Sequence, residues 1–182
     1  GGGRAPQRRG GGGPGAAAAW GVAPGEGETG FAGGSYVVHG LEDNARALAE
    51  FTIGMRQLPN NAEVFTWSGI LERRMALWTE AVRDLEKAME LDPHNALPPF
   101  DLSVTYEMLR DYAGAQRTIA RALIAIPQRA NPLLARKAEI ALLAADSKTC
   151  RSILQSLPAD YQQGGFVPYL WARLALWNRD YA

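Results

Sequence analysis

MELDPHN, from Met89 to Asn95, reveals a repeat in this chain, because two other stretches have the same pattern of a helical end, a proline and an asparagine. RQLPNN runs from Arg56 to Asn61, and IAIPQRAN runs from Ile124 to Asn131. Each joins the end of a helical pattern of apolar residues to a proline, which does not continue a helix. The interval from one proline to the next is 34 residues both times, at Pro59, Pro93 and Pro127. A repeat of this length, made of two helices, indicates a helical solenoid.

Small residues recur at fixed offsets within this period. With residue 62 as position 1, positions 8, 20 and 27 hold Gly69, Ala81 and Ala88, and in the next repeat they hold Ser103, Ala115 and Ala122. Position 24 is a large apolar residue both times, Leu85 and Ile119. Small residues let two helices approach closely, and large apolar residues fill the angle between them. The offsets therefore predict antiparallel helix pairs.

This pattern resembles the tetratricopeptide repeat, most clearly over residues 62–129. The resemblance implies an all-α fold, a right-handed superhelical solenoid of antiparallel helix pairs. On this register residues 28–182 form the array, with about three to four repeats plus a final unpaired helix. We expect the repeats at residues 28–61 (degenerate), 62–95, 96–129, 130–160 (shortened) and 165–182 (truncated).

The outer repeats depart from the pattern. Residues 45–59 are a good second helix, but their partner at residues 31–39 contains Gly33 and Gly34, each of which costs about 1 kcal/mol relative to alanine. Beyond Pro127 we expect helices over residues 133–145 and 148–157. Residues 167–182 are expected to form the first helix of a further repeat, because NRDYA at their end matches LRDYA at residues 109–113.

Residues 1–27 are predicted to be a disordered linker, because they are rich in glycine and proline and too poor in apolar residues to form a core. PGEGETGF, residues 24–31, contains the spacing G-x-G-x-x-G. No β-branched strand precedes it and no Gly-Lys-Ser/Thr follows, so we read the spacing as chance rather than a nucleotide site. The first methionine is Met55, and the chain is expected to be a fragment of a longer protein.

Composition argues against several classes of function. Lys plus Arg equals Asp plus Glu, at 19 each, so no net charge favours nucleic acid or an anionic membrane. No apolar run approaches the roughly 20 residues that span a bilayer. His39 and His94 have no second ligand type at metal spacing, and no cofactor is expected. The single cysteine, Cys150, is expected to be a small buried residue of a cytoplasmic protein.

The resemblance implies that first helices line a concave groove, where partners bind through positions 2, 5, 6, 9, 12 and 13. One departure changes the first of these helices. Ser68 and Glu72 occupy positions that are normally apolar, whereas Val64, Trp67, Leu71, Met75 and Trp78 form an apolar stripe. We therefore expect this helix to be rotated by part of a turn. This rotation puts Trp67 in the core and leaves Thr66, Ile70, Arg73 and Arg74 facing outward.

The candidate groove residues are Thr66, Ile70, Arg73, Arg74, Phe100, Asp101, Val104, Glu107 and Met108. Arg73 and Arg74 are the sharpest candidates, because guanidinium groups bind carboxylates through two hydrogen bonds. The alternative is a solvated face with Glu72 and Glu80 as occasional partners. Asp101 and Glu107 beside the arginines predict a groove of mixed charge.

The leading hypothesis for function is a non-catalytic scaffold that binds a protein or peptide, since no catalytic arrangement can be defended on these helices. The first alternative is a regulatory or sensory C-terminal region of a larger bacterial signalling enzyme, because the array resembles those beside serine/threonine kinase, adenylate cyclase and winged-helix regulator domains. An RNA-binding repeat is less favoured, since phosphates demand a basic face. The last helix carries Leu170, Trp171, Leu174, Ala175, Leu176 and Trp177 without a paired second helix, which predicts self-association.

Overall fold

The computed structural model describes residues 40–178, and all its described helices belong to one compact unit of the chain that begins at His39. Four features predicted from the sequence lie outside these residues. They are the linker at residues 1–27, the glycine-rich stretch at residues 24–31, the helix at residues 31–39, and the last four residues of the chain.

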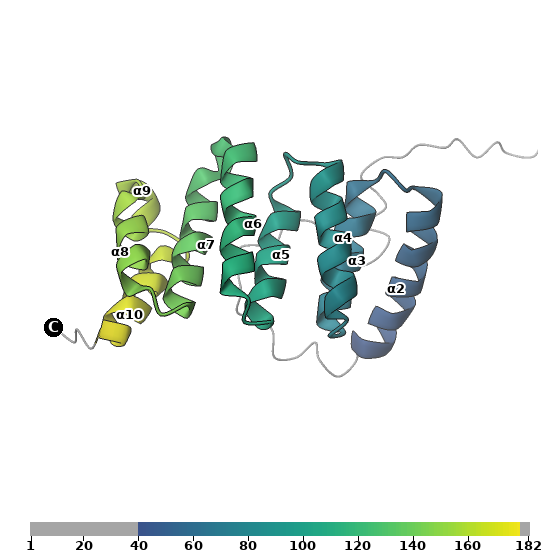
Figure 1. Cartoon of the computed structure of the whole chain (residues 1–182), viewed down its shortest axis with the longest axis horizontal. Coiled ribbons are helices and arrows are strands. Elements are labelled where there is room, and N and C mark those ends of the chain that lie inside the picture. The colour runs from purple at the N-terminus through teal and green to yellow at the C-terminus, as the bar shows by residue number, and fades with distance from the viewer. Residues whose placement is uncertain (1–39, 179–182) are drawn as a thin grey trace, which may run out of the picture. The chain divides into compact units, whose positions relative to one another are not determined.

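Every regular element in residues 40–178 is a helix (Figure 1). The elements are α2 (Gly40–Gln57), α3 (Ala62–Arg74), α4 (Trp78–Leu91), α5 (Leu97–Met108), α6 (Tyr112–Ala125), the 3-10 helix η1 (Pro127–Arg129), α7 (Ala130–Leu143), α8 (Ser147–Ser156), α9 (Ala159–Gln162) and α10 (Val167–Asn178). Successive long helices run antiparallel and pack in order of sequence, α3 with α4, α5 with α6 and α7 with α8. The predicted all-α helical solenoid is therefore confirmed.

Small residues let the paired helices approach closely, as the offsets predict. Ala81, Ala88 and Ala115 are completely buried. A Cβ atom on Gly69 would lie 2.6 Å from Cγ of Leu85 and 3.1 Å from the carbonyl oxygen of Ala81. Because the second contact is with backbone, any side chain at position 69 would force α3 and α4 apart.

Three identical turns join the first helix of each pair to the second, along the lower edge of the array in Figure 1. Each contains one residue with a left-handed backbone: Ala76 (φ 60°), Arg110 (φ 58°) and Ala145 (φ 64°). In each, the next amide donates to the carbonyl oxygen five residues earlier at 2.8 Å, as Leu77 does to Glu72. This bond satisfies a carbonyl that the end of the helix leaves unpaired.

The core is a series of clusters along the array rather than one centre. One joins α3, α4 and α5 around Leu85 and Leu102, and a second joins α6 and α7 around Ile119 and Ile140. The third joins α7, α8 and α10 and contains Cys150, which is a small buried residue as predicted. Each helix pair therefore packs within itself and against its nearest neighbours, which is the pattern of a solenoid.

The third pair differs from the sequence prediction in two details. Helix α7 begins at Ala130 rather than Leu133, because Pro132 falls within its first turn, where a missing amide hydrogen is tolerated. The short helix α9 was not predicted. It follows Pro158, and the side-chain amide of Gln162 donates to the carbonyl oxygen of Leu157, the residue directly after α8, at 2.7 Å.

Candidate functional site

Ion pairs connect each first helix with the first helix of the next pair. Arg73 of α3 pairs with Asp101 of α5, Glu107 of α5 with Arg136 of α7, and Glu139 of α7 with Arg173 of α10. We call these six residues the ion-pair ladder. It follows the face on which the sequence predicts a groove, and three of the nine candidate residues belong to it.

The first pair of the ladder is nearly removed from solvent. Nη2 of Arg73 donates to Oδ1 of Asp101 at 2.6 Å, and the two side chains are 14% and 10% exposed. Burial raises the pKa of Asp101 above its usual value, although the neighbouring guanidinium of Arg73 opposes the rise. The partner of Arg73 is thus Asp101 on the next pair of helices, and not Glu72 or Glu80 as the alternative expectation had it.

Arg136 is the centre of the ladder, with a side chain only 5% exposed. Its Nε donates to Oγ of Ser103 at 2.9 Å, and its two terminal nitrogens bind the carboxylates of Glu107 and Glu139. Its guanidinium carbon also lies 5.6 Å from the ring centroid of Phe100, a cation–π contact. One arginine of α7 thereby holds three side chains of α5 in place.

The ladder reverses its polarity between the first and second steps. Arg73 and Glu107 share repeat position 12, and each pairs with a residue 28 or 29 positions further along the chain. The first step places the base before the acid, and the second places the acid before the base. Helix α5 therefore contributes acids to both its neighbours, and each neighbour contributes an arginine.

The expected rotation of α3 is wrong for Thr66 and Ile70, although Arg74 is exposed as expected. Thr66 and Ile70 are 1% and 5% exposed, whereas Trp67 is only partly buried and packs against the first core cluster. Ser68 and Glu72 face the interior. The physical reason is the close contact of Gly69 with α4, which fixes the orientation of α3 more strongly than its apolar stripe does.

Thr66 and Ile70 therefore do not offer a ligand an exposed surface. The hydroxyl of Thr66 donates to the carbonyl oxygen of Ala62 at 2.7 Å, within its own helix. Arg74, by contrast, is exposed and forms no ion pair with any residue among those described.

An apolar stripe runs along α5 beside the ladder. Leu97, Phe100 and Met108 are 37%, 38% and 55% exposed, and Val104 between them is partly buried. Their spacing of three and four residues places them on one side of the helix. The structure thus brings Phe100, Val104 and Met108 together, as the sequence predicts for one helix face.

Sequence reasoning missed Arg136, Glu139 and Arg173 as parts of this surface. The repeat register is blurred after Pro127, so no position number pointed to them. The signal that could have found Arg136 is the near-equal spacing of Arg73–Asp101 and Glu107–Arg136 with opposite charges.

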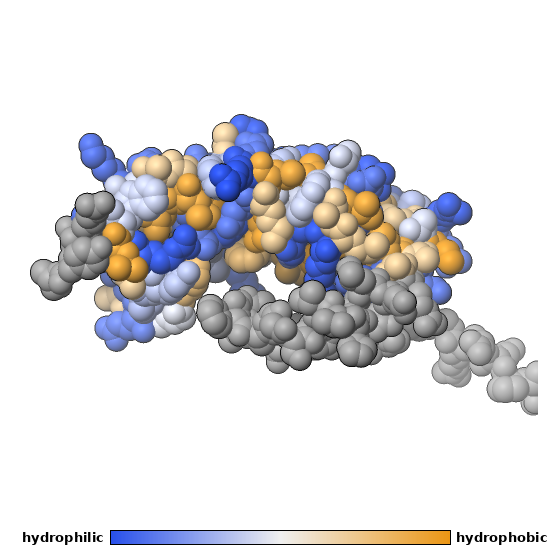
Figure 2. Space-filling model, turned by 90° about the horizontal axis from the view of Figure 1, so that it is seen from below, coloured by the Kyte–Doolittle hydropathy of each residue, from blue (hydrophilic) through white to orange (hydrophobic). Residues whose placement is uncertain are grey.

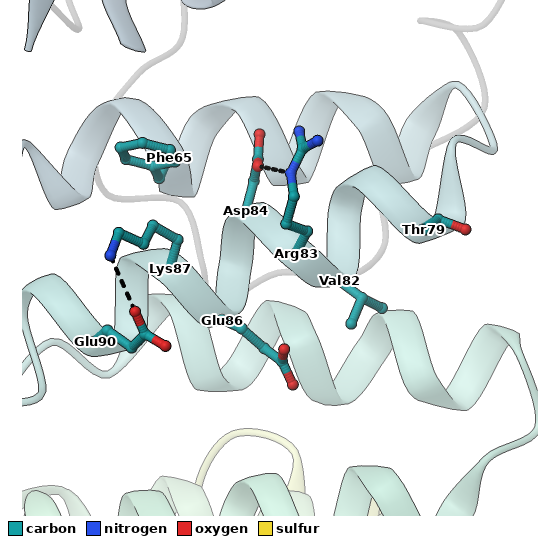
Figure 3. A pocket seen from close by; sticks show the side chains of 8 residues that line it. All are labelled: Phe65, Thr79, Val82, Arg83, Asp84, Glu86, Lys87 and Glu90. Atoms are coloured by element: carbon teal, nitrogen blue, oxygen red, sulfur yellow. Dashed lines mark hydrogen bonds and ion pairs between the residues drawn. The ribbon is translucent and has the colours of Figure 1, made fainter. Parts of the chain in front are cut away.

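A separate hollow of about 500 Å³ lies along the outer side of α4 (Figure 3). Its walls are mostly charged side chains that already pair with one another. Nε of Arg83 donates to Oδ1 of Asp84 at 2.7 Å, and Nζ of Lys87 donates to Oε2 of Glu90 at 3.1 Å. None of the predicted groove residues lines it.

Residues 40–178 contain neither a cluster of metal ligands nor a membrane-spanning helix. No three His, Cys, Asp or Glu side chains of that range lie close enough together to hold a metal ion. None of the helices in it is both long and apolar enough to cross a membrane.

No family model matches the sequence, and no curated protein matches it. Among solved structures, the MamA RS-1 ArsTM double mutant matches 75% of this chain and 86% of its own, with a TM-score of 0.54 at 12% identity. A tetratricopeptide repeat protein from Parabacteroides merdae ATCC 43184 matches 78% of this chain and 59% of its own, with a TM-score of 0.51 at 15% identity. Naa15/Naa10 bound to HypK-THB covers 67% of this chain and 19% of the matched chain, with a TM-score of 0.47 at 22% identity.

This chain spans less than two thirds of the length of two of these three matched chains. At 12% and 15% identity, the two likenesses with the higher TM-scores concern the fold and nothing further. They agree with the succession of antiparallel pairs and the periodic turns described above. The chain therefore has the helical-solenoid fold found in a tetratricopeptide repeat protein.

Proposed function

We propose that this array is a non-catalytic scaffold that binds an extended protein or peptide segment along its first helices. The exposed apolar stripe of α5 is the observation that carries the proposal. A stripe of this kind, rimmed by charged residues, is typical of a surface that another chain covers. The ligand would be a peptide or a segment of another protein, and not part of residues 40–178.

The ion-pair ladder narrows the chemistry of that ligand. Because the charges of Arg73, Asp101, Glu107 and Arg136 are already paired, a ligand gains little by competing for them. The exposed guanidinium of Arg74 is available to bind a carboxylate. We therefore propose a ligand segment with two or three apolar side chains and an acidic group near the α3 side.

Selection from a random peptide library displayed on phage, against the 182-residue chain, tests this proposal. We expect the selected peptides to lose at least tenfold in affinity when Phe100 and Met108 are both changed to alanine. Ile124→Ala is the matched control, because Ile124 is 84% exposed on α6, a second helix. Peptides that bind the double variant as tightly as the native chain would place the ligand elsewhere.

The proposal also concerns the larger protein to which this scaffold would belong and its location in the cell. As the alternative, the chain would be a regulatory region of a larger bacterial signalling enzyme and would bind its ligand through the same face. This alternative rests only on the resemblance of the array to those beside such enzyme domains.

An RNA ligand is disfavoured because most arginines of this face already bind carboxylates. A cytoplasmic location is part of the proposal and agrees with the buried, unpaired thiol of Cys150, whose pKa burial raises.

We also propose that a second copy of the chain binds the outer side of α10. Leu176 and Trp177 are 61% and 56% exposed, and Tyr169 and Phe166 are 50% and 42% exposed. In contrast Leu170 and Leu174, which the sequence prediction also assigned to the open surface, are buried against α7 and α8. Figure 2 shows that hydrophobic and hydrophilic side chains are interspersed along this face of the array.

The order of these residues suits pairing with an identical helix. The stripe of Phe166, Tyr169, Arg173 and Leu176 has the same spacing read in either direction. Two antiparallel copies would place Phe166 opposite Leu176 and Tyr169 opposite Arg173. Within one chain Arg173 already lies 5.5 Å from the ring centroid of Tyr169, so the same cation–π contact can form across the pair.

A further inference from the structure

Two carboxyl groups are buried together between α3 and α4. Glu72 of α3 is 4% exposed and Asp84 of α4 is 1% exposed. Oε2 of Glu72 and Oδ2 of Asp84 have no hydrogen-bond partner among the described residues. Placing two acceptors together without a donor between them is unfavourable, and more so inside a protein than in water.

A single arginine, Arg83, lies near both carboxyl groups. Nε of Arg83 donates to Oδ1 of Asp84 at 2.7 Å, but its Nη2 is 3.9 Å from Oε1 of Glu72. The side chain of Arg83 is 64% exposed, so solvent weakens its attraction for the buried pair. Figure 3 shows this arginine reaching across α4 to Asp84.

The other charges near the pair do not supply the missing cation. Glu80, the further charged group of α4 that acts on Glu72, is an acid. Helices α2 and α5 also pack against α3. None of their described charged groups is among the main influences on the pKa of Glu72. Arg73, the next residue of α3, binds Asp101 instead. If both carboxyl groups were ionised, the exposed guanidinium of Arg83 would therefore compensate less than one of the two buried negative charges.

We propose that Glu72 and Asp84 are a proton-binding pair, in which one proton held at Glu72 makes the packing of α4 on α3 sensitive to pH near neutrality. With the proton in place Glu72 becomes a hydrogen-bond donor to Asp84. Asp84 keeps the hydrogen bond that it accepts from Nε of Arg83. Loss of the proton replaces this hydrogen bond with repulsion between two buried anions.

Burial and the charge of Asp84 raise the pKa of Glu72 from 4.5 to about 7, and Arg83 opposes them only in part. Because the folded chain holds the proton more tightly than the unfolded chain, the stabilisation is complete below about pH 4.5. It is lost as pH rises through about 7. Over this window the equilibrium constant for unfolding rises by up to about tenfold per pH unit.

The position of the pair couples it to the ion-pair ladder. Glu72 directly precedes Arg73, and both lie in the last turns of α3. An α3 that packs less tightly on α4 also holds the guanidinium of Arg73 less firmly against Asp101. Ionisation of Glu72 is therefore expected to loosen the first step of the ladder before the others.

Urea unfolding of the full chain at pH values from 5 to 8 tests the pair, with Glu72→Gln as the decisive variant. Glutamine keeps the shape and a donor but binds no proton. We expect this variant to lose most of the slope with pH between 5 and 7, and to be more stable than the native chain at pH 8. Glu63→Gln, an exposed glutamate at the other end of α3 that is not among the groups acting on Glu72, is the matched control and should keep the native slope.

A direct titration of the native chain tests the proposal independently of the stability of the variants. The side-chain carboxyl carbon of Glu72, followed by NMR in the native chain, is expected to titrate with a midpoint near pH 7. In Asp84→Asn the like charge is gone, and the midpoint should move down by at least one pH unit. A native midpoint at the ordinary value for glutamate, or an unchanged pH slope in Glu72→Gln, would overturn the proposal.

Discussion

At the scale of single residues, pairing decides how much the charged groups matter. The sequence predicts Arg73 as a groove residue, yet its side chain is 14% exposed and its partner Asp101 is 10% exposed. Removing one member of such a pair leaves the other as a buried charge without a counterion. The stability of the array therefore depends on residues that sequence reasoning assigned to ligand binding.

Arg73→Ala is expected to destabilise the chain by up to about 3–5 kcal/mol, because Asp101 remains behind unpaired. Urea denaturation measures this loss. Arg73→Met combined with Asp101→Leu should be markedly more stable than Arg73→Ala, since no isolated charge is left. If the double variant is instead the less stable of the two, the ion pair itself is the source of stability and not the avoidance of a lone carboxylate.

At the scale of elements, three turns of equal geometry differ in their capping. Asp111 and Asp146 accept hydrogen bonds from the amides of Gly114 and Thr149 and so cap the helices α6 and α8. The equivalent residue before α4 is Leu77, which offers no side-chain cap. Its backbone angles, φ −84° and ψ 70°, match those of Asp111, φ −84° and ψ 72°.

Leu77→Asp is expected to raise the free energy of unfolding by about 1 kcal/mol, because an aspartate there can accept the amide of Glu80. Leu77→Ala is the control for the lost leucine side chain, which is 37% exposed. Thermal unfolding of the two variants gives the comparison. An aspartate variant no more stable than the alanine variant would show that the α4 amides are already satisfied.

Sequence periodicity predicted the helices well where both the prolines and the small residues keep their 34-residue interval. Helices α3 to α6 follow from Ala81, Ala88, Ala115 and their equivalents, because close helix packing tolerates no larger side chain there. The orientation of α3 was predicted wrongly, since counting apolar residues ignores that a single glycine contact can outweigh a whole stripe. Arg136, Glu139 and Arg173 of the ladder were not predicted. Ion pairs between repeats depend on the spacing from one repeat to the next, whereas the sequence pattern describes positions within a single repeat.

At the scale of the whole molecule, the array has two different kinds of exposed apolar surface. One is the stripe on α5, between helices that flank it on both sides. The other is the outer side of α10, which no further helix covers within residues 40–178. These surfaces predict different behaviour in solution, because only the second can pair with a copy of itself without steric hindrance from neighbouring helices.

The chain is expected to form dimers through α10 at concentrations in the micromolar range. Leu176→Lys with Trp177→Lys should shift the sedimentation coefficient to that of a monomer, since a lysine at position 176 would lie opposite the apolar ring of Phe166 in the other copy and would lose its hydration there. Ile124→Lys, on the exposed side of α6, is the matched control and should leave the dimer intact. A native chain that sediments as a monomer at all these concentrations contradicts the proposed pairing.

The reversal of polarity between the first two steps of the ladder has a consequence for how such a gene can change. Repeat arrays commonly lengthen or shorten when recombination gains or loses one whole unit. Loss of residues 96–129 would bring the guanidinium of Arg73 opposite that of Arg136, and a second copy of the same unit would set Glu107 opposite a duplicate of Asp101. Either event creates two like charges where a matched pair was buried, so the units of this array are not interchangeable and its length is protected against unequal crossing-over.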